Sequence, residues 1–151
     1  MKKWMLVVGL FAATAMISMA QADAVTSPKE TQGLVASPVA GGTYTLVALT
    51  GPGLFVSAEV VKQGGDGSDM TFVGLEVDGV SMFNQSVIAL SNVGLTQFNT
   101  YGVTLLKPSA AMRTVTIGFP MPMAYTKSLK LWVKVSESSV TQIIGRTISG
   151  H

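Results

Sequence analysis

The segment that most constrains the fold is residues 71–84, TFVGLEVDGVSMFN, in which two stretches of alternating apolar residues flank Asp78-Gly79. An Asp-Gly pair between such stretches predicts a two-residue β-hairpin, because a type I′ turn requires positive φ at both central residues. A turn of this length places Val77 directly opposite Val80. The rest of the chain repeats this alternation, so the hairpin indicates an all-β protein.

The two-residue turn also fixes the pairing farther along both strands, with Leu75 opposite Met82 and Gly74 opposite Phe83. Because side chains of a strand point alternately to its two faces, five apolar residues then share one face that must be buried. These residues are Val73, Leu75, Val77, Val80 and Met82.

Further strands are predicted wherever apolar residues alternate between turn-forming residues. The predicted ranges are 43–50, 54–62, 85–90, 102–107, 113–119, 128–136 and 140–148. Pro120 and Pro122 are expected to end the strand before them, because proline cannot donate to a strand ladder. No segment shows a helical period with caps. About eight or nine short strands with frequent turns predict an antiparallel β-sandwich of jelly-roll or immunoglobulin-like type.

The first 22 residues have the pattern of a secretory signal peptide. Lys2 and Lys3 precede an uncharged apolar run, which ends in two overlapping small-x-small sites, and we expect cleavage after Ala22. Residues 23–42 have little periodicity and are predicted to be a flexible N-terminal arm, followed by one β-sandwich domain over residues 43–151. The expected location is the periplasm or the medium of a bacterium, with no transmembrane segment after cleavage.

Loss of the signal peptide removes two lysines and leaves eight basic and eight acidic residues. A chain that is near neutral gives no reason to expect nucleic acid as a partner. The sequence has no cysteine, so no disulfide can stabilise the fold, and the lipoprotein route of export is excluded.

The residues needed for common catalytic arrangements are scarce. The one histidine, His151, is the last residue, and a terminal residue makes a poor general base. Without cysteine and without a second histidine, neither a Cys-His nor a Ser-His arrangement is expected. Glu59 and Glu76 remain as two strand carboxylates that could share a face, as a glycosidase requires. We expect a protein that is not an enzyme, and we keep a small hydrolase using Glu59 or Glu76 as the second alternative.

Residues 64–69, GGDGSD, begin like a calcium-binding repeat. Asp66 and Asp69 could supply hard oxygen ligands to Ca²⁺. Only one copy is present, however, whereas such repeats bind the ion between stacked copies. A glycine-rich turn without metal is therefore the favoured interpretation, and no cofactor is expected.

The best candidate for ligand binding lies in residues 128–136, the clearest alternation in the chain. If its leucines and valines are buried, Trp132 projects from the opposite face between Lys130 and Lys134, with Lys127 nearby. An outward tryptophan can stack on a sugar ring or receive an apolar group of a partner, and lysines can bind anionic groups. Coverage of Trp132 by a loop or by the N-terminal arm is the alternative.

The favoured function is therefore an exported, non-catalytic protein that binds a glycan or another protein of the envelope. A structural subunit that self-associates through an edge strand or through residues 121–125 is the first alternative. In layout the chain resembles jelly-roll carbohydrate-binding and galactose-binding-like domains, a likeness of architecture that does not fix function.

Overall fold

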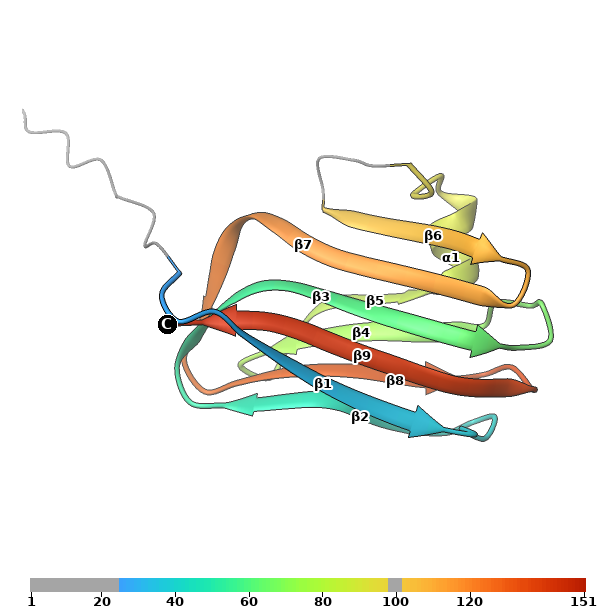
Figure 1. The fold of residues 1–151 in the computed structure, drawn as a ribbon, viewed down its shortest axis with the longest axis horizontal. Coiled ribbons are helices and arrows are strands. Elements are labelled where there is room, and N and C mark those ends of the chain that lie inside the picture. Colours follow the sequence, from blue (N-terminus) through green and yellow to red (C-terminus); the bar gives the residue numbers. More distant parts are fainter. Residues whose placement is uncertain (1–24, 98–101) are drawn as a thin grey trace, which may run out of the picture.

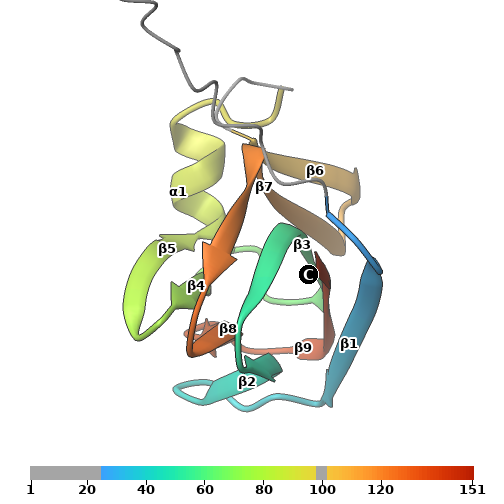
Figure 2. The same ribbon diagram turned by 90° about the vertical axis from the view of Figure 1, so that its left-hand side faces the viewer.

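The computed structural model describes residues 25–97 and 102–151, so the predicted signal peptide lies outside the described residues. The described part contains nine strands in two antiparallel sheets and one short helix, which confirms the predicted β-sandwich (Figures 1 and 2). Its elements are β1 (Lys29–Ala36), β2 (Thr43–Thr50), β3 (Gly53–Gly64), β4 (Thr71–Val77), β5 (Val80–Ser86), α1 (Val87–Asn92), β6 (Val103–Ser109), β7 (Met112–Tyr125), β8 (Ser128–Val135) and β9 (Val140–Gly150).

The strand order is that of a jelly roll with one strand added. The five-stranded sheet has the order β1-β9-β3-β7-β6, and the four-stranded sheet has the order β2-β8-β4-β5. When β6 is left out, the orders are β1-β9-β3-β7 and β2-β8-β4-β5. In each sheet, strands from the first half of the chain then alternate with strands from the second half, which is the arrangement of a double-sheet jelly roll built from two Greek keys. In Figure 2, α1 lies at the side where the edge strands β5 and β6 leave the sandwich open. No helix of the described residues is long and apolar enough to cross a membrane.

The prediction of a flexible N-terminal arm is wrong for residues 29–36, because these residues form β1. This strand pairs with β9 from Lys29 opposite Ser149 to Ala36 opposite Gln142. Among the described strands β1 has a neighbour on one edge only. Its residues alternate between exposed and half-buried, so its sequence lacks the strong alternation of a buried strand. Glycine is required at Gly33, where a Cβ would collide with the carbonyl oxygen of Leu46 on β2.

The predicted hairpin turn is confirmed. Asp78 and Gly79 have φ of 52° and 83°, and Val77 lies opposite Val80. The predicted register is wrong farther from the turn, because a bulge between Leu75 and Glu76 pairs Leu75 with Phe83 instead of Met82.

The hairpin buries fewer of its apolar residues than predicted. Val73, Leu75 and Val77 of β4 are buried as predicted. On the edge strand β5, however, the side chains of Val80 and Met82 do not face the opposite sheet, and they are 60% and 47% exposed. Gly74 lies opposite Asn84 rather than Phe83.

Residues 85–90, predicted as a strand, instead contain the start of α1. Ser86 is its N-cap, with extended backbone and a side-chain Oγ that accepts a hydrogen bond from the Ala89 N–H at 3.2 Å. Val87 and Leu90, three residues apart, are the buried residues of the helix. A helix of six residues is too short to produce a clear helical period in the sequence.

The prediction that the prolines end the strand before them is also wrong, since β7 continues to Tyr125. Its pairing with β3 passes from Gly118 opposite Ser57 directly to Met123 opposite Phe55. Pro120 and Pro122 lie in the interruption, where no ladder hydrogen bond to β3 is lost.

The core lies between the two sheets, and β8 contributes its most regular part. Four alternate residues of this strand have no exposed surface, as the sequence predicted: Leu129, Leu131, Val133 and Val135. They pack in one cluster with the inward residues of the other strands and with α1, including Phe55, Val60, Leu75, Leu90, Leu105, Ile117 and Ile143. The side chains between them on β8 must therefore point away from the core.

Candidate functional site

Trp132 lies on the outer face of the four-stranded sheet, as the alternation of β8 predicted. It is opposite Thr45 of β2 on one side and Gly74 of β4 on the other. The indole covers Gly74 so closely that a Cβ there would lie 2.1 Å from its Cε2 atom. Trp132 is half-buried, and in Figure 2 no helix or strand of the described residues lies outside this sheet. One side of the indole therefore rests on the sheet, while its remaining surface faces outward.

The predicted lysines Lys130 and Lys134 flank Trp132 on the same face. The Lys130 Nζ lies 3.0 Å from Oε2 of Glu76, with side chains that are 39% and 29% exposed. Lys134 is exposed, lies opposite Phe72 of β4 and makes no ion pair with any described residue. The face thus combines one compensated cation, one uncompensated cation and an aromatic ring.

Lys127 does not join this group. It lies in the turn between β7 and β8, where its backbone N–H donates to Oδ1 of Asp78 at 2.7 Å. Trp132 lies five positions farther along the chain, which corresponds to about 17 Å along β8. We call the group formed by Trp132, Lys130, Lys134, Phe72 and Glu76 the outer-face site.

Phe72 and the pairing of Glu76 with Lys130 were not part of the predicted site. Phe72 is half-buried and alternates with the buried residues of β4, so its outward direction follows from the same alternation that placed Trp132. The sequence did not reveal that β4 pairs with β8. This pairing brings Phe72 opposite Lys134 and Glu76 opposite Lys130.

The expectation that Glu59 and Glu76 share a face is wrong. Glu59 lies between the buried Ala58 and Val60 of β3, so it points outward from the five-stranded sheet. Glu76 points outward from the four-stranded sheet. The two carboxylates lie on opposite sides of the sandwich and cannot flank one glycosidic bond, and Glu59 is paired with Arg146 at 3.1 Å.

The two aspartates proposed as weak calcium ligands are each bound to protein groups. Asp66 accepts hydrogen bonds from the N–H of Ser68 and from the N–H and hydroxyl of Ser138, which hold the pKa of its carboxyl well below the usual range. Asp69 is buried and faces Lys62 and Arg113. Within residues 25–97 and 102–151, no three acidic or histidine side chains are arranged to hold a metal ion.

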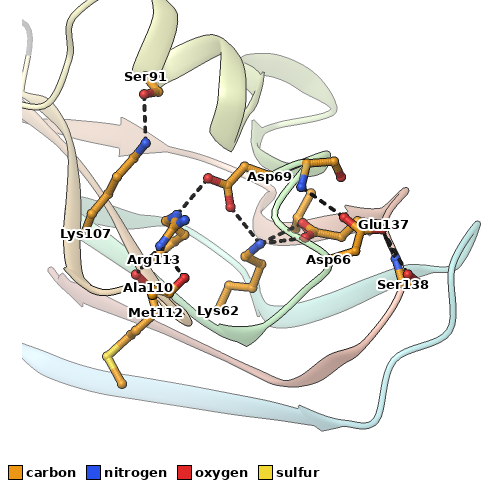
Figure 3. Close-up of polar contacts among 12 residues, drawn as sticks. Lys62, Asp66, Asp69, Ser91, Lys107, Ala110, Met112, Arg113, Glu137 and Ser138 are labelled. Carbon is orange, nitrogen blue, oxygen red and sulfur yellow. Dashed lines mark hydrogen bonds and ion pairs between the residues drawn. The ribbon is translucent and has the colours of Figure 1, made fainter.

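Asp69 belongs to a buried ionic cluster that the sequence prediction missed (Figure 3). Lys62 of β3 places its Nζ 3.0 Å from Oδ1 of Asp69 and 2.8 Å from both carboxylate oxygens of Glu137. The side chains of Lys62, Asp69 and Glu137 are 2%, 5% and 0% exposed. Thr71 donates its hydroxyl to Oε1 of Glu137 at 2.6 Å, and Arg113 donates its Nε–H to Oδ2 of Asp69 at 2.7 Å.

The charges of this buried ionic cluster balance, since it contains two cations and two carboxylates. Burial alone would raise the pKa of Asp69, but hydrogen bonds and positive charge from Arg113 and Lys62 lower it below the usual value. The sequence carried one signal of this cluster, because Lys62 has the same parity in β3 as the inward Ala58 and Val60.

The end of the sandwich where β2 turns into β3 has two open hollows. They have volumes of about 480 and 540 Å³ and share Pro52, Tyr125 and His151 in their walls. His151 is held there by reciprocal backbone hydrogen bonds with Thr26. Its imidazole lies beside no described carboxylate within ion-pair distance.

Comparison with known proteins gives no family for this chain. No protein-family model and no curated protein matches it. Among solved structures, it is similar to dimeric latent PorU from Porphyromonas gingivalis, with 13% identity, a TM-score of 0.35, and coverage of 87% of this chain and 14% of that one. It is also similar to the infectious bursal disease virus VP2 subviral particle, with 13% identity, a TM-score of 0.27, and coverage of 95% of this chain and 45% of that one. Neither likeness carries an argument about function.

Proposed function

We propose that this protein is a non-catalytic binding protein and that its outer-face site binds a glycan. The observation that carries the proposal is the position of Trp132, whose ring rests on Gly74 and leaves surface exposed in the middle of a sheet. A ring supported in this way loses little conformational entropy when a ligand stacks on it. A sugar ring offers a matching flat apolar surface edged by hydroxyl groups.

Polar groups around Trp132 supply hydrogen-bond partners for such hydroxyls. Thr45 is exposed beside it, Asn84 is exposed on β5 opposite Gly74, and Lys134 lies two residues farther along β8. The site is a face rather than a deep pocket, which suits a chain of sugars better than a single small molecule. Lys134 favours a glycan that carries acidic groups.

The test is a glycan array with the mature protein, followed by measurement of Kd for the best ligand with Trp132→Ala. We expect this variant to melt close to the parent and to bind more weakly by about 2 kcal/mol, roughly a thirtyfold rise in Kd. Trp132→Tyr keeps an aromatic face and should retain most of the affinity. Ile148→Ala, on the outer face of the other sheet, is the matched control and should leave binding unchanged.

Two results would argue against this function. One is an array on which the folded protein binds no glycan. The other is a Trp132→Ala variant that unfolds as badly as Leu131→Ala, because the tryptophan would then serve the core, where truncation of a large side chain costs about 2–5 kcal/mol.

Self-association is the second candidate function, and it has its own observation. β5 is an edge strand whose outer edge has no partner among the described strands, and it carries the exposed apolar residues Val80 and Met82. Such an edge can pair with a strand of another copy. Light scattering of the mature protein should then show a stable oligomer at low concentration, and Met82→Lys should return it to a monomer.

Export remains part of the proposal. It rests on the signal-peptide pattern of residues 1–22. Mass spectrometry of protein from the envelope fraction or the medium should find a chain that begins at Asp23, whereas an intact Met1 on a membrane-bound protein would overturn it.

A further inference from the structure

The buried ionic cluster has no part in the outer-face site, and its geometry suits a covalent reaction. A lysine side chain that is 2% exposed lies in contact with two carboxylates that are 5% and 0% exposed. We propose that Lys62 and Asp69 react with one another to form an intramolecular amide bond between Nζ and Cγ, with Glu137 as the proton carrier.

The reacting groups are held together by the fold. Lys62 lies near the end of β3 and Asp69 lies in the loop before β4, where its φ is 54°. The Nζ atom is 3.0 Å from Oδ1 of Asp69, so the fold holds the nucleophile against the carboxyl group that it attacks. Because strands and loop backbone fix these positions, the two groups react within one molecule and do not have to meet by diffusion, as separate reactants would.

The loop backbone also closes the site to solvent. Gly65 has φ of 114°, and a Cβ at this position would lie 2.3 Å from Oε2 of Glu137 and 2.9 Å from Nζ of Lys62. Only the bare glycine backbone can lie so close to the reacting groups. Since amide formation releases water, exclusion of water from the site favours the bond and protects it from hydrolysis.

The reaction needs no other reactant. A lysine ammonium and an aspartate carboxylate together contain the atoms of one amide and one water. The Nζ lone pair forms the new bond to Cγ after one proton has moved to Glu137, and the Cγ–Oδ1 bond breaks with its electron pair remaining on oxygen. Two of the three ammonium protons end on Oδ1, which leaves as water, and the third stays on the amide nitrogen. Nothing is oxidised or reduced.

Glu137 has the position of a proton carrier. Both of its carboxylate oxygens lie 2.8 Å from Nζ, so a proton can pass to one of them without a water molecule. The hydroxyl of Thr71 at 2.6 Å from Oε1 fixes the orientation of the carboxylate.

Arg113 distinguishes Asp69 from Glu137 as the carboxyl group that is attacked. Its Nε lies 2.7 Å from Oδ2 of Asp69, the oxygen that becomes the amide carbonyl and that carries negative charge after attack. A fixed cationic donor at that atom stabilises the tetrahedral intermediate, as in an oxyanion hole. Glu137 receives the neutral donor Thr71 instead. After the reaction one positive and one negative group remain, so the cluster is still balanced.

The first measurement is the intact mass of the folded mature protein after denaturation. We expect a mass about 18 Da below that of the sequence, the loss of one water when lysine acts as a nucleophile on a carboxyl group. Trypsin should no longer cleave after Lys62, and fragmentation should place the loss between Lys62 and Asp69. A protein of full mass, after prolonged incubation in the folded state, would overturn the proposal.

The place of the loss matters, because Asp66-Gly67 and Asp78-Gly79 can each lose one water by forming a succinimide. Hydroxylamine cleaves the chain at a succinimide and leaves a side-chain amide intact. A loss that maps to either Asp-Gly pair and disappears with hydroxylamine would therefore overturn the proposal.

Three variants assign the roles. Asp69→Asn should still react but lose ammonia, about 17 Da, because lysine then displaces nitrogen instead of oxygen. Lys62→Arg should keep its full mass. Glu137→Gln should keep the full mass or react much more slowly, since it cannot accept the proton. A 17 Da loss in Glu137→Gln would instead identify Glu137 as the attacked residue and overturn the assignment to Asp69, and an unchanged 18 Da loss would overturn its role as proton carrier. The mass and peptide map of the parent decide the bond even if a variant fails to fold.

Discussion

Two lysine–glutamate contacts of almost equal length lie on the two sides of the four-stranded sheet. Lys62 and Glu137 are 2.8 Å apart with almost no exposed surface, whereas Lys130 and Glu76 are 3.0 Å apart and remain 39% and 29% exposed. The distances would suggest similar energies. The difference in burial predicts otherwise, because a buried charge that loses its partner cannot be solvated, while an exposed one returns to water.

The largest expected effect separates these two pairs directly. Lys62→Met should destabilise the protein by about 3–5 kcal/mol, because the variant holds two buried carboxylates with only one cation, whether or not Lys62 of the parent has formed the amide bond. Lys130→Met is the matched control and should change the free energy of unfolding by about 1 kcal/mol or less. Urea melts of the three proteins measure both values, and equal losses for the two variants would contradict the role given to burial.

The neutral donors of the two regions extend the comparison. Thr71 is fully buried and donates to Glu137, so Thr71→Val should cost about 1–3 kcal/mol by leaving a buried oxygen with one donor fewer. Thr45, on the exposed face beside Trp132, is its matched control, and Thr45→Val should lie within about 0.5 kcal/mol of the parent. Denaturant midpoints at equal slopes test the pair. A Thr71→Val variant as stable as Thr45→Val would show that the hydroxyl does not matter to the cluster.

These two regions also show what the sequence can and cannot predict. Alternation along β8 was sufficient to direct Trp132 outward and Leu131 inward, because a strand with one buried face has only one possible register toward the core. Alternation along β3 likewise gives Lys62 the same parity as the inward Ala58 and Val60. It could not name Glu137, which lies 75 residues later in a loop whose position depends on the complete strand order.

The elements that the sequence prediction missed are those with little burial or short length. β1 is an edge strand with half-exposed residues, and α1 has two buried residues in six. For β1, the apolar pattern is too weak to outweigh the prolines on either side of it. For α1, it is too weak to outweigh the valine and isoleucine, which favour a strand. The hairpin register failed beyond the turn for another reason, since a bulge inserts one residue without changing the apolar pattern near Asp78-Gly79.

Asp78 is intermediate between the buried and the exposed region. Its carboxylate lies at the surface but accepts hydrogen bonds from the backbone N–H groups of Thr126, Lys127 and Ser128, which hold its pKa well below the usual range. A carboxyl group with a lower pKa in the folded protein stabilises the fold above its unfolded pKa of about 4, and this contribution decreases as the pH falls below that value.

Asp78→Asn should therefore melt below the parent at pH 7, and the difference should shrink as the pH is lowered from about 4. Thermal melts of both proteins between pH 7 and pH 2.5 provide the measurement. Lys127→Ala is the control, since its backbone N–H is kept, and it should follow the parent at every pH. A difference between parent and Asp78→Asn that is independent of pH would show that the charge of the carboxylate contributes nothing.

The smallest expected effect concerns the exposed pair itself. A double-mutant cycle with Lys130→Gln and Glu76→Gln should give a coupling energy of about 0.2–1 kcal/mol. The coupling should decrease in 1 M salt, where charges are screened within about 3 Å. A coupling of several kcal/mol that salt does not change would mean that this pair is as desolvated as Lys62 and Glu137.

The same Glu76→Gln variant also tests the outer-face site. It releases Lys130 from its partner and raises the charge of the face, so an acidic glycan should bind it more tightly than the parent at low salt, whereas a neutral glycan should not distinguish the two.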